Sequence, residues 1–256
     1  ALERALASDN DIAGVITEGS GASYGTVPLE TGFVEGVRKL TEQYGVVMIL
    51  DEVITGFRWS PGGLQQQLGI APDLTTMAKI LTGGLPGGAV AGRNEVMAVM
   101  EQTGDSSHDR FERVYHGGTF NANPYCAATG NAALKIAATG EMQETASRMA
   151  ERLRVGLREI VDRYEVAACV YGQSSTFHIF FGTRSIEGLD ANTLKSAPPE
   201  VQSNFRKALQ VRGVDLMSRT SGVLSGVHTE ADIDQSIDAF DGAIRAMMEE
   251  GLISHQ

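Results

Sequence analysis

The sequence contains little cysteine and few basic residues, and each shortage argues against a class of protein. Its 256 residues include two cysteines, Cys126 and Cys169, which stand alone without the spacing of metal ligands. We therefore expect reduced thiols, no metal site and a cytoplasmic protein. Lysine and arginine number 21 against 32 aspartate and glutamate residues, and the basic residues form no cluster. This balance argues against a nucleic acid or a membrane surface as a partner.

Long apolar runs are also missing from the sequence. No segment has the length of a transmembrane span, and nothing at the amino end resembles a signal peptide. The first residue is Ala1 rather than methionine, so we expect a start that was processed, engineered or cut from a longer chain. With 42% hydrophobic residues, the chain has enough apolar material for one large folded domain or two smaller ones.

A short apolar run at residues 46–50 ends in two carboxylates. Its β-branched members predict a strand that is covered on both faces, as in a parallel sheet. Asp51 and Glu52 then lie at the carboxyl end of that strand, where open α/β sheets bind their ligands. Taken alone, Asp51 also fits an exposed residue at the start of a loop. Glu52 fits either a support of that loop or a role beside a ligand.

The elements around this run alternate between strand and helix. Residues 11–18 and 46–50 predict strands, and the amphipathic stretch 30–45 between them predicts a helix. This order indicates a right-handed parallel crossover. Two further short, buried strands are expected at residues 71–80 and 87–92, on either side of a glycine-rich turn. The first part of the chain is therefore expected to be α/β.

After Pro124 the sequence indicates long helices and a second group of strands. Apolar residues recur at three- and four-residue steps from Met142 to Tyr164, which predicts one helix of about six turns. Thr229 is expected to cap the final helix. The other expected elements are strands at 166–171 and 175–181 and a helix at 199–212. His178 lies in the second of these strands, and we expect it to be a core residue with its polar atoms satisfied.

Three separated motifs resemble those of one enzyme family. They are LDEVITGFR at residues 50–58, AKILTGGLPGGAVAG at 78–92 and HGGTFNANP at 116–124, and they occur in the family's order. In these motifs the sequence is similar to the class III aminotransferases, which are pyridoxal-phosphate enzymes of fold type I. The similarity is greatest to the glutamate-1-semialdehyde aminomutase branch.

This resemblance implies catalytic roles for Asp51 and Lys79. Asp51 would contact the pyridine nitrogen of pyridoxal 5'-phosphate and hold its proton by opposite charge. Lys79 would form the covalent link to the cofactor aldehyde. An amine suits that position because it condenses with the aldehyde, is displaced by a substrate amine and can then move a proton.

The resemblance assigns three further residues to cofactor binding. Val53 would pack on one face of the ring, and Thr119 would reach the cofactor phosphate of a neighbouring subunit. Gly118 would let the backbone approach that phosphate closely. A homodimer is expected from this contact between subunits. From the residues alone, Val53 fits an ordinary core position and Thr119 fits a turn.

The sequence departs from full-length members of the family in one large respect. It lacks their amino-terminal portion, which carries a phosphate loop and an aromatic residue that stacks on the ring. We therefore expect a truncated fold type I protein with a mixed, mainly parallel sheet. Its parts would be the carboxyl-side portion of the large α/β cofactor domain, a helical connection and a small α+β domain, at residues 1–123, 124–164 and 165–256.

The expected activity is amino transfer between a primary amine or amino acid and an aldehyde or ketone. One alternative is a glutamate-1-semialdehyde-type aminomutase, although Thr220 stands about where that branch has a glutamate. Another alternative is a non-catalytic fragment or subunit that pairs with the missing amino-terminal half. Arg184 is a candidate for contact with a substrate carboxylate, and an ordinary surface arginine is the other interpretation.

Overall fold

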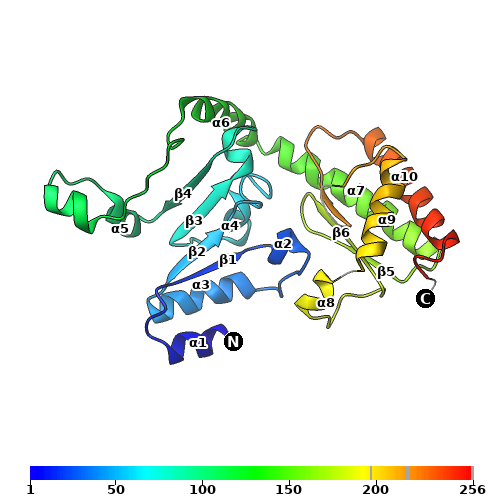
Figure 1. The fold of residues 1–256 in the computed structure, drawn as a ribbon, viewed down its shortest axis with the longest axis horizontal. Helices are drawn as coiled ribbons and strands as arrows, with labels where there is room; N and C mark the ends of the chain where they lie inside the picture. The colour runs from blue at the N-terminus through cyan, green and yellow to red at the C-terminus, as the bar shows by residue number, and fades with distance from the viewer. Residues whose placement is uncertain (197, 217–219, 255–256) are drawn as a thin grey trace. The chain divides into compact units, whose positions relative to one another are not determined.

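The computed structural model describes residues 1–196, 198–216 and 220–254. The chain forms two compact units (Figure 1). Unit 1 comprises Ala1–Gly19 and Leu29–Thr139. Unit 2 comprises Ser20–Pro28 and Gly140–Gln256, so a short early segment belongs with the second half of the chain. None of the helices in the described ranges combines the length and the apolarity that crossing a membrane requires.

Unit 1 is built on a four-stranded sheet with the order β1-β2-β3-β4. The strands are Gly14–Glu18, Val47–Asp51, Leu74–Ala78 and Gly88–Gly92. Strands β1, β2 and β3 are parallel, and β4 runs antiparallel to β3. Helix α3, Phe33–Tyr44, connects β1 to β2, and Gly45 ends it in a left-handed conformation at φ 67°. The predicted mixed, mainly parallel α/β architecture is confirmed.

Among the described residues, only one face of this sheet is well covered. The sequence predicted strands covered on both faces, and this prediction was wrong. Met48 and Leu50 of β2 are fully buried against Val34 and Val37 of α3. On the opposite face Ile16 is 62% exposed. Strand β4, predicted to be buried, is exposed along its whole length. An apolar run shows that a strand can be buried, but it does not show whether each face has a covering element within the chain.

The rest of unit 1 consists of short helices and one longer helix. Helix α6, Pro124–Ala137, begins after Asn123, whose side chain accepts hydrogen bonds from the amides of Tyr125 and Cys126. Proline occupies the first helical position, where no backbone N–H is needed. The short helices are α1 Leu2–Ser8, α4 Gly63–Leu68, η1 Lys79–Thr82, α5 Asn94–Met97, η2 Ala98–Met100 and η3 His108–Glu112.

Unit 2 packs helices against an antiparallel sheet with the order β5-β6-β7. The strands are Ala168–Tyr171, Thr176–Phe181 and Ser221–Val223. The helices are α2 Ala22–Gly25, α7 Glu141–Arg163, α8 Ala191–Lys195, α9 Pro199–Gln210 and α10 Glu230–Glu249. The predicted apolar stripe is buried from Ala146 to Ile160 of α7, whereas Met142 is exposed and Tyr164 is partly buried. Thr229 caps α10 as predicted and forms a capping box with Asp232.

The predicted helical region 124–164 contains two helices, α6 and α7. Gly140, in the left-handed conformation at φ 80°, separates α6 from α7. Helix α6 groups with unit 1, whereas α7 groups with unit 2. The three-part division predicted from the sequence stays a prediction.

His178 anchors the early segment of unit 2. Its Nδ1 lies 2.8 Å from the Ser221 hydroxyl, and its Nε2 lies 3.2 Å from the carbonyl oxygen of Tyr24. Its ring packs on the rings of Tyr24 and Tyr171, and the Tyr171 hydroxyl donates to the carbonyl of Thr26 at 2.8 Å. Burial lowers the pKa of His178 to about 4. The prediction of a satisfied core histidine is confirmed.

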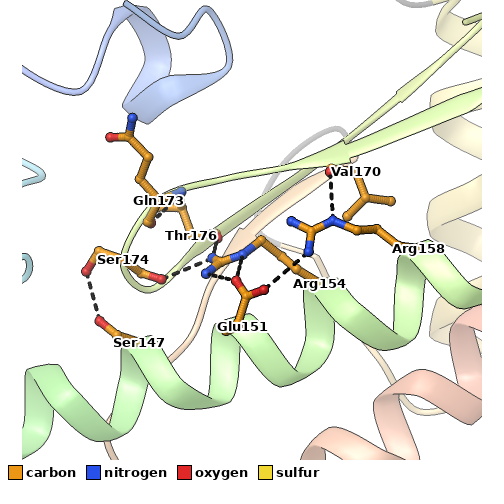
Figure 2. Close-up of polar contacts among 8 residues, drawn as sticks. All are labelled: Ser147, Glu151, Arg154, Arg158, Val170, Gln173, Ser174 and Thr176. Atoms are coloured by element: carbon orange, nitrogen blue, oxygen red, sulfur yellow. Dashed lines mark hydrogen bonds and ion pairs between the residues drawn. The ribbon is translucent and has the colours of Figure 1, made fainter. Parts of the chain in front are cut away.

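Arg154 fixes the turn between β5 and β6 onto α7 (Figure 2). Its guanidinium donates to Glu151 of the same helix and to the carbonyl oxygens of Ser174 and Thr176. Arg158 also contacts Glu151, at 3.2 Å. Burial acts to raise the pKa of Glu151, but the two guanidinium groups outweigh it and lower that pKa. The buried guanidinium of Arg154 therefore has a structural role.

Arg184 is also tied to a helix end. Its guanidinium donates to the carbonyl of Val161 at 3.1 Å and lies 3.4 Å from a carboxylate oxygen of Asp162. A cation near the last carbonyls of α7 is favoured by the helix dipole. These contacts give Arg184 a structural role in this chain.

Candidate functional site

Asp51 is the last residue of β2, and two hydrogen bonds hold its carboxylate. Its Oδ1 accepts from the backbone N–H of Val53 at 2.9 Å and from the hydroxyl of Thr76 at 3.1 Å. Thr76 is the register partner of Asp51 in the parallel β2–β3 pair, so the two side chains leave the sheet on the same face. Asp51 is half-buried and belongs to a strand. It is therefore not the exposed loop residue of the plainer interpretation.

The second carboxylate oxygen of Asp51 is unengaged. In the described ranges no hydrogen bond and no ion pair reaches Oδ2. A carboxylate held by one oxygen is oriented but can still accept a hydrogen bond from a ligand. Asp51 lies on the sheet face that carries the exposed Ile16, since Ile16 pairs with Ile49 two residues earlier in β2. The free oxygen thus lies on the less covered face.

Lys79 follows the carboxyl end of the neighbouring strand β3 and begins η1. Its backbone is in the left-handed region at φ 55°, which is unusual for a residue with a side chain. Such a conformation costs on the order of 1 kcal/mol or more, and active sites and ligand clamps are places where it recurs. Lys79 is exposed, and its amine has no hydrogen bond or ion pair within the part of the chain that is described.

Helix α6 packs closely against the η1 turn and contacts its backbone. The Thr129 hydroxyl donates to the carbonyl of Thr82 at 2.8 Å. A Cβ atom added to Gly130 would lie 2.5 Å from the carbonyl oxygen of Leu81, so only glycine permits this approach. Gly83 ends η1 at φ 61°. The position of Lys79 therefore depends on a close contact between two segments that are distant in sequence.

Glu52 supports the loop and has no free oxygen to offer a ligand. It is 1% exposed and accepts hydrogen bonds from the N–H groups of Leu64 and Gln65 at 3.0 and 2.9 Å. The Thr55 hydroxyl also donates to it. These amides belong to the first turn of α4, so the carboxylate occupies the end of the helix that attracts negative charge. Of the two interpretations of Glu52, the structural one is confirmed.

The structure places the other predicted site residues as follows. Val53 is half-buried and lies beside Asp51 through its backbone N–H. Thr119 and Gly118 lie in an exposed loop, where the Asn121 N–H donates to the carbonyl of Gly118 at 3.0 Å. Among the described residues, no hydrogen bond connects this loop to Asp51 or Lys79. The cofactor roles predicted for Asp51, Val53, Lys79, Gly118 and Thr119 stay predictions.

Sequence reasoning missed one residue of the site, which is Thr76. It lies 25 positions after Asp51, and nothing in the apolar pattern of β3 distinguishes it from Thr75. The signal that could have found it is the register of the two parallel strands. A residue three positions before Lys79 falls beside Asp51 when the ends of β2 and β3 are aligned.

The arrangement has two complementary chemical abilities. The free oxygen of Asp51 can accept a hydrogen bond from a protonated nitrogen, and the unpaired amine of Lys79 can condense with an aldehyde. Both groups lie at the carboxyl ends of adjacent parallel strands, which is where open α/β sheets bind ligands. This combination suits a small heteroaromatic aldehyde with a basic ring nitrogen.

Comparisons with known proteins place the chain in a family. The sequence model of the family described as aminotransferase class-III matches residues 1–215. A relative from Nitratidesulfovibrio vulgaris, glutamate-1-semialdehyde 2,1-aminomutase, is 35% identical over 90% of this chain and 52% of its own length. A solved omega-transaminase from Sphaerobacter thermophilus is 34% identical, with a TM-score of 0.83 over 95% of this chain and 54% of its own.

A further solved structure is described as a transaminase with PLP bound. It is 25% identical and has a TM-score of 0.81, and the match covers 98% of this chain and 55% of the other. The predicted fold type I architecture is confirmed by these structures. The chain spans about half the length of the curated relatives that it matches.

Proposed function

Because the chain belongs to the class III aminotransferase family, we propose that it forms part of a pyridoxal-phosphate-dependent aminotransferase. The reaction moves an amino group between a primary amine or amino acid and an aldehyde or ketone. The observation that carries this proposal is the pair of groups on neighbouring strand ends, Asp51 with one free carboxylate oxygen and Lys79 with an unpaired amine. The similarity to a solved omega-transaminase supports it.

Each of these residues has a distinct task in the proposed reaction. When bound, pyridoxal phosphate supplies a ring that accepts the electrons released by breaking the C–H bond next to the amine. The amine of Lys79 would hold the cofactor covalently through its aldehyde and, once displaced by the substrate amine, would carry the proton between carbon atoms. The free oxygen of Asp51 would keep the ring nitrogen protonated through opposite charge.

The remaining cofactor contacts would come from Val53, Gly118 and Thr119. The backbone N–H of Val53 bonds to Asp51, which places this residue next to the carboxylate that would meet the ring. Thr119 and Gly118 lie in an exposed loop, which suits a contact with the cofactor phosphate of a second copy. We therefore infer a homodimer, with a small-molecule amine donor and a carbonyl acceptor as its other partners. The cytoplasmic location expected from the sequence stays a prediction.

An aminomutase is the second candidate, because a relative 35% identical over most of this chain carries that name. Thr220, which stands about where that branch has a glutamate, is buried and bonds to the carbonyl of Ile179. It offers no carboxylate, so we favour transamination between two molecules. The two activities differ in one requirement. A transaminase needs a separate carbonyl acceptor to turn over repeatedly, whereas an aminomutase does not.

The third candidate is a non-catalytic subunit or fragment that pairs with an amino-terminal half. The fact that this chain spans about half the length of its relatives is consistent with that role. The free Asp51 oxygen and the unpaired Lys79 amine favour catalysis instead, since a purely structural piece has no need of either. Supplying the amino-terminal half of a relative in trans would show whether the chain is active by itself or only in that pair.

Covalent attachment at Lys79 is the direct test of the proposed function. Pyridoxal phosphate is added to the purified chain, the product is reduced with borohydride, and the peptides are mapped by mass spectrometry. We expect the adduct on Lys79 and its loss in Lys79→Ala. Lys39→Ala is the matched control, because Lys39 is an exposed lysine of the same unit and its removal should leave the adduct intact. An adduct on another lysine, or none, contradicts the proposal.

A further inference from the structure

Thr76 of β3 forms a hydrogen bond with one oxygen of the Asp51 carboxylate. The Thr76 hydroxyl donates to Asp51 Oδ1 at 3.1 Å. Next to it, the Glu52 N–H donates to the carbonyl of Thr76 at 2.9 Å, so the two backbones are joined at the same point. The strand register therefore fixes the distance between this hydroxyl and the carboxylate.

The hydrogen bond decides which carboxylate oxygen is available. Oδ1 receives two donors, the hydroxyl of Thr76 and the N–H of Val53. With Oδ1 anchored on both sides, rotation of the carboxylate is restricted and Oδ2 keeps its place on the less covered face of the sheet. Without the hydroxyl, Oδ1 would retain only the bond from its own turn, which does not fix the plane of the group.

We propose that Thr76 is a positioning residue, which orients Asp51 so that Oδ2 is presented to the ring nitrogen of the cofactor. This inference rests on the proposed function. Thr76 itself touches neither the cofactor nor a substrate in this account. Its effect is transmitted through Asp51 alone, so it must disappear when the Asp51 charge or the ring nitrogen is removed.

The adjacent residue Thr75 provides a matched control. It lies in the same strand, but it points to the opposite face, is 6% exposed and accepts a hydrogen bond from Gln65 at 3.3 Å. Valine has nearly the shape of threonine and suits a strand equally well, so each Thr→Val change removes one hydroxyl with little change in packing. Each change removes one side-chain hydrogen bond, but only Thr76→Val removes a bond to Asp51.

The experiment measures the dissociation constant of pyridoxal phosphate by absorbance titration of the purified full chain. Thr76→Val should weaken binding about tenfold, as is common when a residue that orients a ligand-binding group is removed. Thr76→Ser, which keeps the hydroxyl, should stay within about twofold of the parent. Thr75→Val should bind like the parent. Thermal melting identifies any variant that fails to fold, and Thr76→Ala then replaces Thr76→Val.

Two further arms test whether the effect passes through Asp51. In the Asp51→Asn background, Thr76→Val should cause little additional loss, because coupled residues are not additive. With a cofactor analogue in which carbon replaces the ring nitrogen, the parent and Thr76→Val should bind equally.

Three results would overturn the inference while leaving the proposed function intact. They are equal binding of pyridoxal phosphate by Thr76→Val and the parent, an undiminished loss in the Asp51→Asn background, and an undiminished loss with the nitrogen-free analogue. If the parent itself binds no pyridoxal phosphate, the proposed function fails, and this inference fails with it. The parent titration therefore distinguishes the two kinds of failure.

Discussion

Asp51 gives the first prediction at the scale of single residues. Asp51→Asn keeps the size of the side chain and can still accept the hydrogen bond from Thr76. It removes the negative charge that would hold the ring proton. Charge partners of this kind contribute on the order of 3 kcal/mol in a water-poor site, so turnover should fall about a hundredfold. The covalent adduct on Lys79 should persist.

A single-turnover assay measures this effect without knowledge of the natural acceptor. An amine donor is added to the cofactor-loaded protein, and the decay of its visible absorbance band is followed. Lys79→Ala is the contrasting variant, because it should prevent formation of the adduct itself. A decay in Asp51→Asn as fast as in the parent would show that the carboxylate carries no chemistry.

His178 gives a pH prediction. Burial lowers its pKa in the folded chain to about 4, below the value of about 6.5 for an exposed histidine. The folded state thus binds fewer protons than the unfolded state between these values. The stabilisation from neutral His178 is fully present above about pH 6.5 and is lost as pH falls toward 4, by about 3 kcal/mol in total. Tyr24 and Tyr171 pack on the ring, and the positive charge of Arg154 also acts to lower its pKa.

Hydrogen exchange of β6 peptides, measured by mass spectrometry from pH 7 to pH 4.5 and corrected for intrinsic rates, checks this prediction. His178→Gln can keep contacts with Tyr24 and Ser221 but does not titrate, so its opening free energy should change less with pH. Glu151 and Asp73 also have lowered pKa values, but they are present in both proteins. Equal pH dependence in parent and variant would exclude His178 as the source.

Residues could be predicted from the sequence only where a motif or a local pattern marks them. Asp51 and Lys79 stand in recognisable motifs, and His178 was expected in the core because its strand is apolar. Thr76 was missed because its contact crosses between strands and depends on their register. The left-handed backbone of Lys79 could not be predicted either, because that conformation is usually adopted by glycine and not by lysine.

At the scale of elements, the contact between α6 and η1 is the feature to test. Gly130→Ala would place a Cβ atom 2.5 Å from the Leu81 carbonyl oxygen. The clash should displace the turn that carries Lys79 and lower the free energy of unfolding by about 1–3 kcal/mol, even though alanine is the better helix former. The denaturant concentration at the midpoint of unfolding should fall, and so should the yield of the Lys79 adduct.

Gly36→Ala in α3 is the control for this change. A Cβ atom at Gly36 would meet nothing within 4 Å, and the residue lies inside a helix. This variant should gain up to about 1 kcal/mol from helix propensity and keep the full adduct yield. If Gly130→Ala gains stability as well, the close approach of α6 to η1 is not a constraint on the site.

Elements were predicted well where periodicity is long and less well where burial depends on neighbours. The stripe along α7 and the cap of α10 were both expected from local sequence. Strand β4 was expected to be buried, yet it is an edge strand whose residues are all exposed in the described part of the chain. The local sequence predicts that a strand forms, whereas its burial depends on segments that are distant in the sequence.

At the scale of the whole molecule, we predict self-association. Ile16 and Val90 are exposed on the open sheet face, and Tyr115, Phe120 and Tyr125 are each more than 75% exposed. Apolar surface of this kind is usually covered by a partner. Light scattering at micromolar concentration should give about twice the chain mass of 27.3 kDa. Thr119→Ala should keep that mass and weaken cofactor binding. A clean monomer that binds cofactor tightly would deny Thr119 a role between subunits.

The membership of Ser20–Pro28 in unit 2 matters for anyone who recombines this chain with a relative. A crossover placed at Gly140 does not exchange one complete unit for another. It separates Tyr171 and His178, inherited from one parent, from Tyr24 and Thr26, inherited from the other. Chimeras that take residues 20–28 and 140–256 from the same parent should therefore survive more often than those joined at a single point.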